Sequence, residues 1–129
     1  MVGIPYDPEL VRRDFPTVEL AEGEALDLLA TAAPPTALFT AQNLLTLGAI
    51  RALRKCELQH RVALIGFDDL TLADVLDPAI SAIVQDPHTE GRIAAELLFA
   101  RLAGDRSPSK DVVVPTRLVA RGSGEIPAP

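Results

Sequence analysis

Two short apolar runs flank an apolar helical pattern in the middle of the chain. The runs are Ala37–Thr40 and Val62–Phe67, and the helical pattern between them covers Asn43–Lys55. Both runs are uniformly apolar rather than alternating, which is typical of parallel strands that are covered on two faces. Strand, helix and strand in this order predict a βαβ unit.

The rest of the chain predicts further elements of the same kinds. Thr17 is a suitable helix N-cap, and Pro34 and Pro35 stop the helix that it opens. Pro115 interrupts the last apolar run, as expected of an edge strand or a crossover. The expected elements are the tail of a strand over Met1–Tyr6, a turn over Glu9–Arg13, helices over Val18–Ala30 and Thr89–Ala103, a helical turn over Leu70–Ala79, and strands over Ile80–Gln85 and Val112–Ala120. The fold class is therefore α/β, a mostly parallel sheet flanked by helices.

The central helix is apolar around most of its circumference. Ala49, Ile50 and Leu53 can cover the sheet, whereas Leu44 and Leu47 point elsewhere. A helix that is apolar on nearly all sides is buried on more than one side. The second side therefore needs another helix or a second copy of the chain.

Composition bounds the function. The 129 residues are 48% hydrophobic, enough for one domain with its own core. The net charge of −6 argues against nucleic-acid binding by this chain, because phosphate contacts need clustered Lys and Arg. We find no signal peptide and no segment of membrane-spanning length. The single Cys56 cannot form an internal disulfide, so a cytoplasmic location is expected.

Polar side chains follow the two strands of the βαβ unit. Gln42 and Asn43 come after the first strand, and Asp68 and Asp69 come after the second. Open parallel sheets bind ligands beyond the carboxyl ends of their strands. We therefore expect any ligand site to have Gln42 and Asp68 in one crevice.

Five blocks of sequence together resemble the C-terminal half of lactose-repressor-type (LacI family) transcription regulators. They are TALFTAQNLLTLGAIRALRK, VALIGFDD, DPAISAIVQDP, GRIAAELLFARLAG and VVVPTRLVARGS. The resemblance covers roughly Asp14 to Ser123. It implies part of a periplasmic-binding-protein-like sensor of two α/β lobes, with a small effector between the lobes and a separate helix-turn-helix for DNA.

The resemblance also implies that the sensor domain is incomplete at its N-terminal side. The family has a further strand in the middle of this sheet, and it places the helix matching Thr89–Ala103 on the other lobe. We expect a partial effector-binding domain over residues 1–123 and a disordered tail over residues 124–129, with the Gly/Pro-rich segment loose from Gly122 onward. The expected partners are a small effector of the sugar or nucleoside class and a second copy of the chain.

The resemblance implies four ligand-binding residues, and each has a structural alternative. Asp68 matches an acid that contacts the effector, but an Asp here can also cap a turn. Gln42 stands where the family has Asn, and the neighbouring Asn43 is also a good helix N-cap. Phe15 matches an aromatic that stacks on a ring, or it is a hydrophobic staple. Gln85 matches a cleft glutamine, or it is an ordinary amide at a strand end.

In the family, the residues matching Leu47 and Leu76 lie at the subunit contact. The resemblance and the apolar circumference of the central helix therefore agree, and we expect a dimer interface that includes Leu44, Leu47 and Leu76. We expect no catalytic residues, cofactor or metal, since His60, His88 and Cys56 lack partners at useful spacing. Two alternatives stay open: a structural fragment without ligand binding, and a small α/β enzyme that uses Asp68.

Overall fold

The computed structural model describes residue 3 and residues 5–128. The strand tail expected over Met1–Tyr6 lies partly outside these residues, and the turn expected after it is a short 3-10 helix, η1. The elements in chain order are η1 (Pro8–Leu10), α1 (Val18–Leu29), β1 (Ala37–Thr40), α2 (Asn43–Lys55), β2 (Ala63–Phe67), β3 (Ser81–Val84), α3 (Pro87–Leu102) and β4 (Arg117–Val119).

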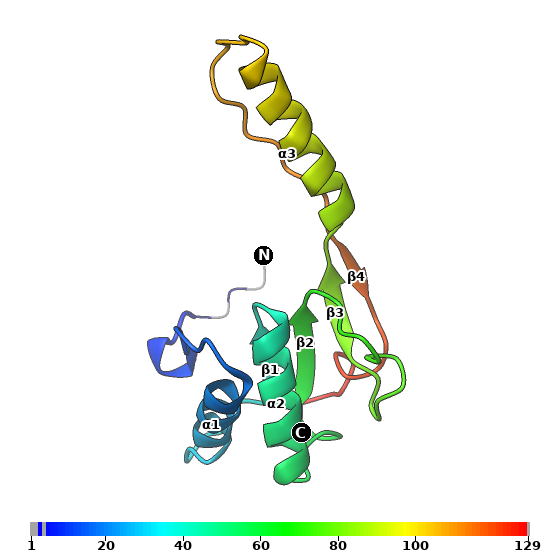
Figure 1. The fold of residues 1–129 in the computed structure, drawn as a ribbon. Helices are drawn as coiled ribbons and strands as arrows, with labels where there is room; N and C mark the ends of the chain where they lie inside the picture. The colour runs from blue at the N-terminus through cyan, green and yellow to red at the C-terminus, as the bar shows by residue number, and fades with distance from the viewer. Residues whose placement is uncertain (1–2, 4, 129) are drawn as a thin grey trace.

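The four strands form one sheet in the order β1-β2-β3-β4 (Figure 1). β1 pairs with β2, and β2 with β3, in parallel, whereas β4 is antiparallel to β3. The predicted α/β class and the β1-α2-β2 unit are thus confirmed. Among the described residues, β1 and β4 are the two edge strands of this sheet.

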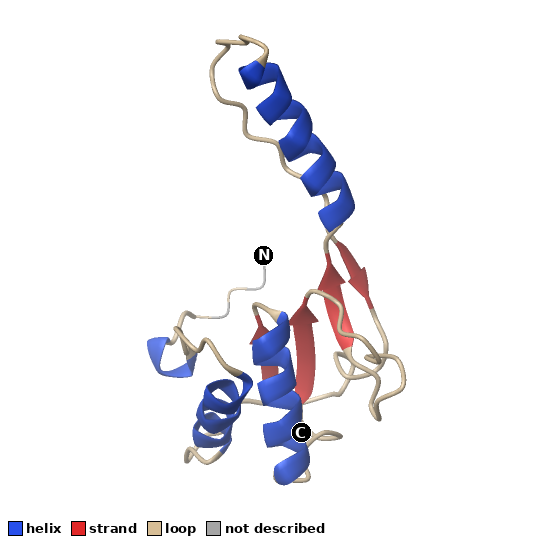
Figure 2. Cartoon of the chain, viewed as in Figure 1, coloured by secondary structure: helices blue, strands red, loops and turns tan. Residues whose placement is uncertain are grey.

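The core is built from α1, α2 and the sheet, and the two helices lie side by side (Figure 2). α2 lies against β1 and β2, and α1 packs on α2. Ala49, Ala52 and Leu53 of α2 are buried against Leu64 of β2. A side chain at Gly48 would lie 2.6 Å from the Cβ of Ala21, so this glycine allows the two helices to approach closely.

Thr17 caps α1 as predicted, because its Oγ1 accepts a hydrogen bond from the Leu20 N–H. Gln42 rather than Asn43 occupies the cap position of α2, so the N-cap interpretation of Asn43 was wrong. α3 begins earlier than predicted because Asp86 caps it and Pro87 takes its first position. Within the range expected to be a helical turn, residues 71–75 form hydrogen-bonded turns, in which the Ala73 N–H donates to the Leu70 carbonyl and the Val75 N–H donates to the Leu72 carbonyl. Ala79, at the end of the range, forms a β-bridge with Gly122.

The C-terminal segment differs from its prediction in two ways. Only Arg117–Val119 of the expected Val112–Ala120 strand pairs with β3. Gly122 and Ser123, expected to be loose, are held in place. Ser123 is 1% exposed, and its Oγ donates to the Leu64 carbonyl at 2.6 Å and accepts from the Ser81 N–H at 2.8 Å. Ser123 therefore links β2 to β3.

α3 projects away from the sheet (Figure 1). None of its residues, Pro87–Leu102, is buried. Leu98, Phe99 and Leu102 have 58%, 67% and 73% of their surfaces exposed. This placement agrees with the expectation that α3 has no surface to pack on within the chain.

Candidate functional site

Three of the predicted ligand residues follow three adjacent strands. Gln42 follows β1, Asp68 follows β2 and Gln85 follows β3. Because these strands are parallel neighbours, their carboxyl ends meet at one edge of the sheet, the upper edge in Figure 1. The structure thus brings Gln42 and Asp68 to the same edge, as predicted, together with Gln85.

Thr46 fixes the turn that carries Gln42. Its buried Oγ1 donates to the Gln42 carbonyl at 3.1 Å and shares a hydrogen bond of 2.8 Å with Thr40 Oγ1. Gly66 of β2 makes room for this side chain, since a Cβ there would lie 2.9 Å from Thr46 Oγ1. The Gln42 side chain makes no capping hydrogen bond to the described start of α2. Its exposed amide is therefore available to a ligand.

Asp68 has an unusual backbone conformation. Its φ is +68°, in the left-handed region where Asp is tolerated better than most residues other than Gly. Its N–H donates to the Ile83 carbonyl at 2.9 Å, so the backbone is held between β2 and β3. Such conformations persist only where the surrounding structure enforces them, and they occur often at functional sites.

The neighbouring carboxylate, Asp69, is held by an arginine from the C-terminal segment. Arg121 Nη1 and Nη2 each donate to one Asp69 oxygen at 2.7 Å. Arg121 Nη1 also donates to the Ile80 carbonyl at 3.0 Å. The hydrogen bonds between the two side chains lower the pKa of Asp69 and raise the pKa of Arg121. Asp69 therefore acts as an anchor for the turn that presents Asp68.

Gln85 is half-buried, next to the residue that caps α3. Asp86 accepts hydrogen bonds from the Thr89 N–H at 3.0 Å and the Thr89 hydroxyl at 2.7 Å. The backbone hydrogen bond is the main reason that the pKa of Asp86 is lowered. The Asp86 carboxylate is used to cap α3. The Gln85 amide is therefore the polar group after β3 that can contact a ligand.

Phe15 lies in a different environment from these three residues. It lines a groove of about 190 Å³ beside β1, together with Thr40 and Leu45 but not with Gln42, Asp68 or Gln85. Thr17 is the N-cap of α1, so a hydrophobic staple would need Pro16, the residue directly before the cap. Phe15 does not occupy the staple position.

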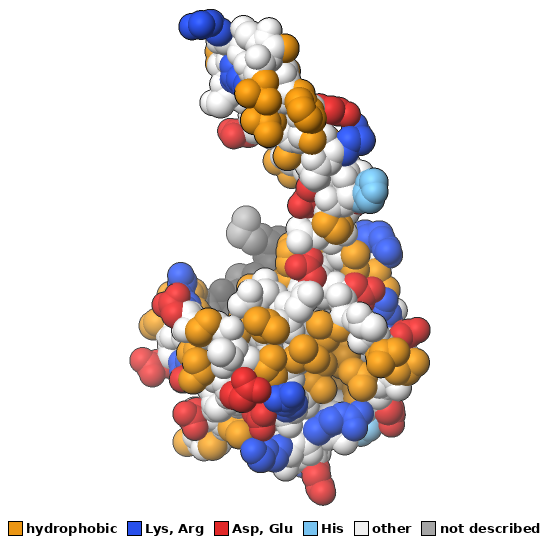
Figure 3. All heavy atoms as spheres, in the orientation of Figure 1, with side chains coloured by type: hydrophobic (Ala, Val, Ile, Leu, Met, Phe, Trp, Pro, Cys, Tyr) orange, Lys and Arg blue, Asp and Glu red, His pale blue; other side chains and the backbone are white. Residues whose placement is uncertain are grey.

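The predicted dimer residues belong to an apolar surface on α2 and the loop after β2. Leu44 and Leu47 are 42% and 39% exposed, and Leu72 and Val75 are 64% and 67% exposed. On the face shown in Figure 3, apolar side chains gather over this region. Leu76 lies deeper.

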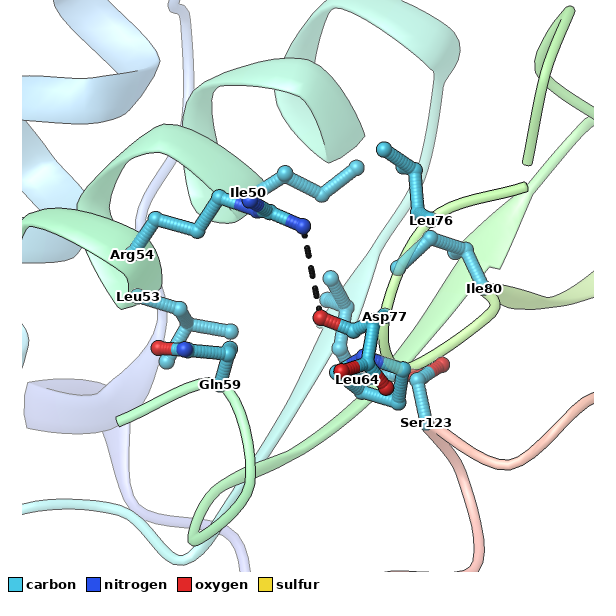
Figure 4. A pocket seen from close by; sticks show the side chains of 10 residues that line it. Ile50, Leu53, Arg54, Gln59, Leu64, Leu76, Asp77, Ile80 and Ser123 are labelled. Atoms are coloured by element: carbon cyan, nitrogen blue, oxygen red, sulfur yellow. Dashed lines mark hydrogen bonds between the residues drawn. The ribbon is translucent and has the colours of Figure 1, made fainter. Parts of the chain in front are cut away.

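A small hollow of about 20 Å³ separates α2 from this loop (Figure 4). Ile50 and Leu76 both line it, and Arg54 donates to the Asp77 carbonyl at 3.3 Å across it. The loop is therefore fixed to α2 at the base of the apolar surface.

The described residues offer little other chemistry. No group of three or more His, Cys, Asp or Glu side chains in this part of the chain could hold a metal ion. His60 lies 3.6 Å from Asp77 and is more than half exposed. None of the described helices is long and apolar enough to cross a membrane.

Sequence reasoning missed the residues that support the site. Thr46, Ser81 and Ser123 are buried polar residues, and Arg121 holds Asp69. Arg121 and Ser123 lie in the ARGS end of the last block that carries the resemblance, which was a usable signal. Thr46 gave no signal, because a lone Thr in an apolar helix has no distinctive pattern.

Comparisons with known proteins agree with this architecture. The model of the periplasmic binding protein-like domain matches residues 2–124. The transcriptional regulator PtxS of Pseudomonas aeruginosa is 41% identical over 98 residues, covering 74% of this chain and 29% of PtxS. A LacI-family regulatory protein from Chloroflexus aggregans is similar in structure, with a TM-score of 0.80, 30% identity, and coverage of 93% of this chain and 44% of that chain.

The complex of the transcriptional regulator CelR with cellobiose gives a TM-score of 0.84 at 32% identity. The match covers 95% of this chain and 38% of the CelR chain, and the sequence relative of that name is from Thermobifida fusca. The chain thus spans 29% of PtxS and 36% of CelR, about a third of the curated relatives it matches.

Proposed function

This chain belongs to the periplasmic binding protein-like domain family, in the form found in LacI-family regulators, and from that premise we propose that it senses a small effector and dimerises. The observation that carries the proposal is the meeting of Gln42, Asp68 and Gln85 at the carboxyl edge of three adjacent parallel strands. The chain covers only part of the sensor domain of its relatives.

The three side chains suit a polyhydroxylated ligand. A carboxylate accepts hydrogen bonds from hydroxyl groups, and the two amides both donate and accept. The left-handed backbone of Asp68 and the anchoring of Asp69 by Arg121 support a preorganised acceptor at this edge. We infer that the effector belongs to the sugar or nucleoside class. The complex of CelR with cellobiose favours a sugar.

We expect this chain to bind its effector weakly. A small-molecule site normally buries most of its ligand, whereas Gln42 is exposed and Asp68 and Gln85 are only half-buried. Phe15, as the aromatic of the site, would stack on a ring only if the ligand extends toward the groove beside β1. We therefore expect no submicromolar binder.

Dimerisation uses the apolar surface of α2. Leu44 and Leu47 are exposed on a helix whose other face is buried, and Leu76 lies at the base of the same surface. Burying two Leu side chains per subunit contributes several kcal/mol per dimer at roughly 25 cal/mol per Å² of apolar area, before the cost of association. DNA contact belongs to a separate headpiece in this proposal, because the chain itself is acidic.

A second candidate is an association fragment without a working cleft. The observation that favours it is the separation of Phe15, in the groove beside β1, from the three polar residues. Calorimetric titration with a panel of sugars and nucleosides distinguishes the two. Weak saturable binding that Asp68→Asn abolishes supports the sensor, whereas no binding by any member of the panel supports the fragment.

A further inference from the structure

Gln42 occupies the cap position of α2 without capping the helix. Its backbone is extended, with φ at −166° and ψ at 163°, and its side chain makes no hydrogen bond to the described start of α2. A capping side chain at this position normally helps to fix the first turn of a helix. The turn from β1 into α2 must therefore be held by another group.

That group is the hydroxyl of Thr46, four residues further along the chain. The Thr46 N–H and the Thr46 Oγ1 both donate to the Gln42 carbonyl, at 3.0 Å and 3.1 Å. Thr46 is 0% exposed, so water does not compete for these hydrogen bonds. Together they fix the Gln42 carbonyl, and with it the direction in which the Gln42 side chain leaves the backbone.

A second threonine sets the direction of the hydrogen bonds. Thr46 Oγ1 lies 2.8 Å from Thr40 Oγ1, and the distance alone allows either oxygen to be the donor. A hydroxyl group has only one proton to donate. If Thr46 donated its proton to Thr40, two acceptor oxygens would face each other at 3.1 Å in a buried position, which is unfavourable. Thr40 therefore donates to Thr46, and Thr46 donates to Gln42.

Packing confines the Thr46 side chain to this arrangement. Gly66 of β2 is the register partner of Thr40 in β1, so the two residues lie side by side under α2. A Cβ at Gly66 would lie 2.9 Å from Thr46 Oγ1 and 3.0 Å from Thr46 Cγ2. The glycine therefore provides the room that the hydroxyl needs. These contacts join β1, α2 and β2, the unit whose strands carry Gln42 and Asp68.

We propose that Thr46, oriented by Thr40, is a positioning residue for Gln42 in the effector site. The inference rests on the proposed function, and both threonines act on the effector only through Gln42. Fixing the backbone of a residue costs conformational entropy. A turn that is already fixed before the effector arrives leaves less of this cost to be met on binding. The hydrogen bonds from Thr40 through Thr46 to Gln42 therefore raise the affinity for the effector.

An NMR titration of Thr46 variants with cellobiose tests the proposal. We expect Thr46→Val to raise the dissociation constant at least about fivefold, because the Gln42 backbone must then be ordered on binding. Thr46→Ser keeps the hydroxyl and should bind like the wild type. The matched control is Thr31→Val, since Thr31 Oγ1 also donates to a backbone carbonyl, that of Leu28, at 2.9 Å at the end of α1. Equal affinity of Thr46→Val and the wild type overturns the proposal.

Double variants separate positioning from a general structural role. In a Gln42→Ala background, Thr46→Val should cause no further loss of affinity, because Thr46 acts only through the Gln42 side chain. An equal loss in both backgrounds contradicts the proposal. Thr40→Val should weaken binding less than Thr46→Val, since Thr46 keeps its proton for the Gln42 carbonyl. A larger loss in Thr40→Val would show that the direction of the hydrogen bonds is wrong.

A measurement without ligand distinguishes this inference from the effector site itself. The NMR order parameter of the Gln42 backbone amide should be about 0.85 in the wild type and in Thr46→Ser, and should fall toward about 0.6 in Thr46→Val. Gly66→Ala, which displaces Thr46 Oγ1 but keeps its hydroxyl, should have the same effect. No binding of cellobiose by the wild type, together with this fall, contradicts the effector site but supports the positioning of Gln42. An unchanged order parameter overturns the inference.

Discussion

Arg121 holds both oxygens of Asp69, each at 2.7 Å. The two residues lie 52 positions apart in the sequence, so this pair ties the turn after β2 to the segment after β4. Asp69 directly follows Asp68, the proposed ligand acceptor. The conformation of Asp68 is therefore coupled to the C-terminal segment of the chain.

Removing the charge of Asp69 should destabilise the fold. We expect Asp69→Asn to lower the free energy of unfolding at pH 7 by about 1 kcal/mol. This is less than the roughly 1.5–3 kcal/mol typical of hydrogen bonds to charged groups, because solvent screens a partly exposed pair. Urea unfolding measures this difference. Asp111→Asn, an exposed carboxylate between α3 and β4, is the control and should have no effect.

The effect of Asp69→Asn should depend on pH. The pKa of Asp69 in the folded chain lies below its ordinary value of 3.8, chiefly through the hydrogen bonds from Arg121. A lowered folded pKa means that the stabilisation is complete above the unfolded pKa and is lost as the pH falls through the folded pKa. The difference between wild type and Asp69→Asn should therefore shrink below about pH 4. A stability difference between wild type and Asp69→Asn that increases as the pH falls would contradict this prediction.

Ser123→Ala should lower the free energy of unfolding more than the same substitution at a surface serine. Its Oγ is the partner of both the Leu64 carbonyl and the Ser81 N–H, and leaving a buried N–H unpaired costs about 1–3 kcal/mol. Thermal and urea unfolding measure the loss, with the exposed Ser109→Ala as control. Equal stability of the two variants would show that Ser123 is not needed to join the strands.

The sequence predicted the elements whose signal is local. β1 and α2 have the predicted bounds, because uniform apolar runs and helical spacing are properties of a few neighbouring residues. The Thr17 cap is equally local. The strand-end placement of Gln42 and Asp68 then followed from the parallel order of β1 and β2.

The features that were missed depend on distant parts of the chain. Gly122 and Ser123 belong to a Gly/Pro-rich stretch whose composition predicts a flexible segment. Ser123 nevertheless forms hydrogen bonds with the backbone of both β2 and β3. Val112 to Val114 has strong strand propensity, but only Arg117–Val119 pairs with another strand. Propensity alone does not say whether a neighbour exists.

Leu47→Glu should abolish the proposed dimer contact through α2. A carboxylate in the centre of an apolar surface is costly to desolvate, so sedimentation equilibrium should show an increase of at least about tenfold in the dissociation constant, or about 1.4 kcal/mol. Leu20→Glu is the matched control, since Leu20 is a 52% exposed apolar residue on α1. Unchanged association of Leu47→Glu excludes this helix as the contact.

The purified chain should not bind duplex DNA by itself. Its net charge of −6 repels phosphate, and nonspecific binding requires clustered basic side chains. A gel-shift titration at low salt checks this, with a basic DNA-binding protein as the positive control. A salt-sensitive shift of the duplex would overturn the assignment of DNA contact to a separate headpiece.

The most direct test of the proposed effector site is a residue-resolved NMR titration with cellobiose and a panel of related sugars and nucleosides. We predict saturable amide shifts near Gln42, Asp68 and Gln85 with a dissociation constant above about 1 μM, and their loss in Asp68→Asn, a change that the left-handed backbone tolerates. Amide shifts elsewhere in Asp68→Asn should stay unchanged. Saturable shifts confined to another surface, or no shifts with any ligand, would contradict an effector site at this edge of the sheet.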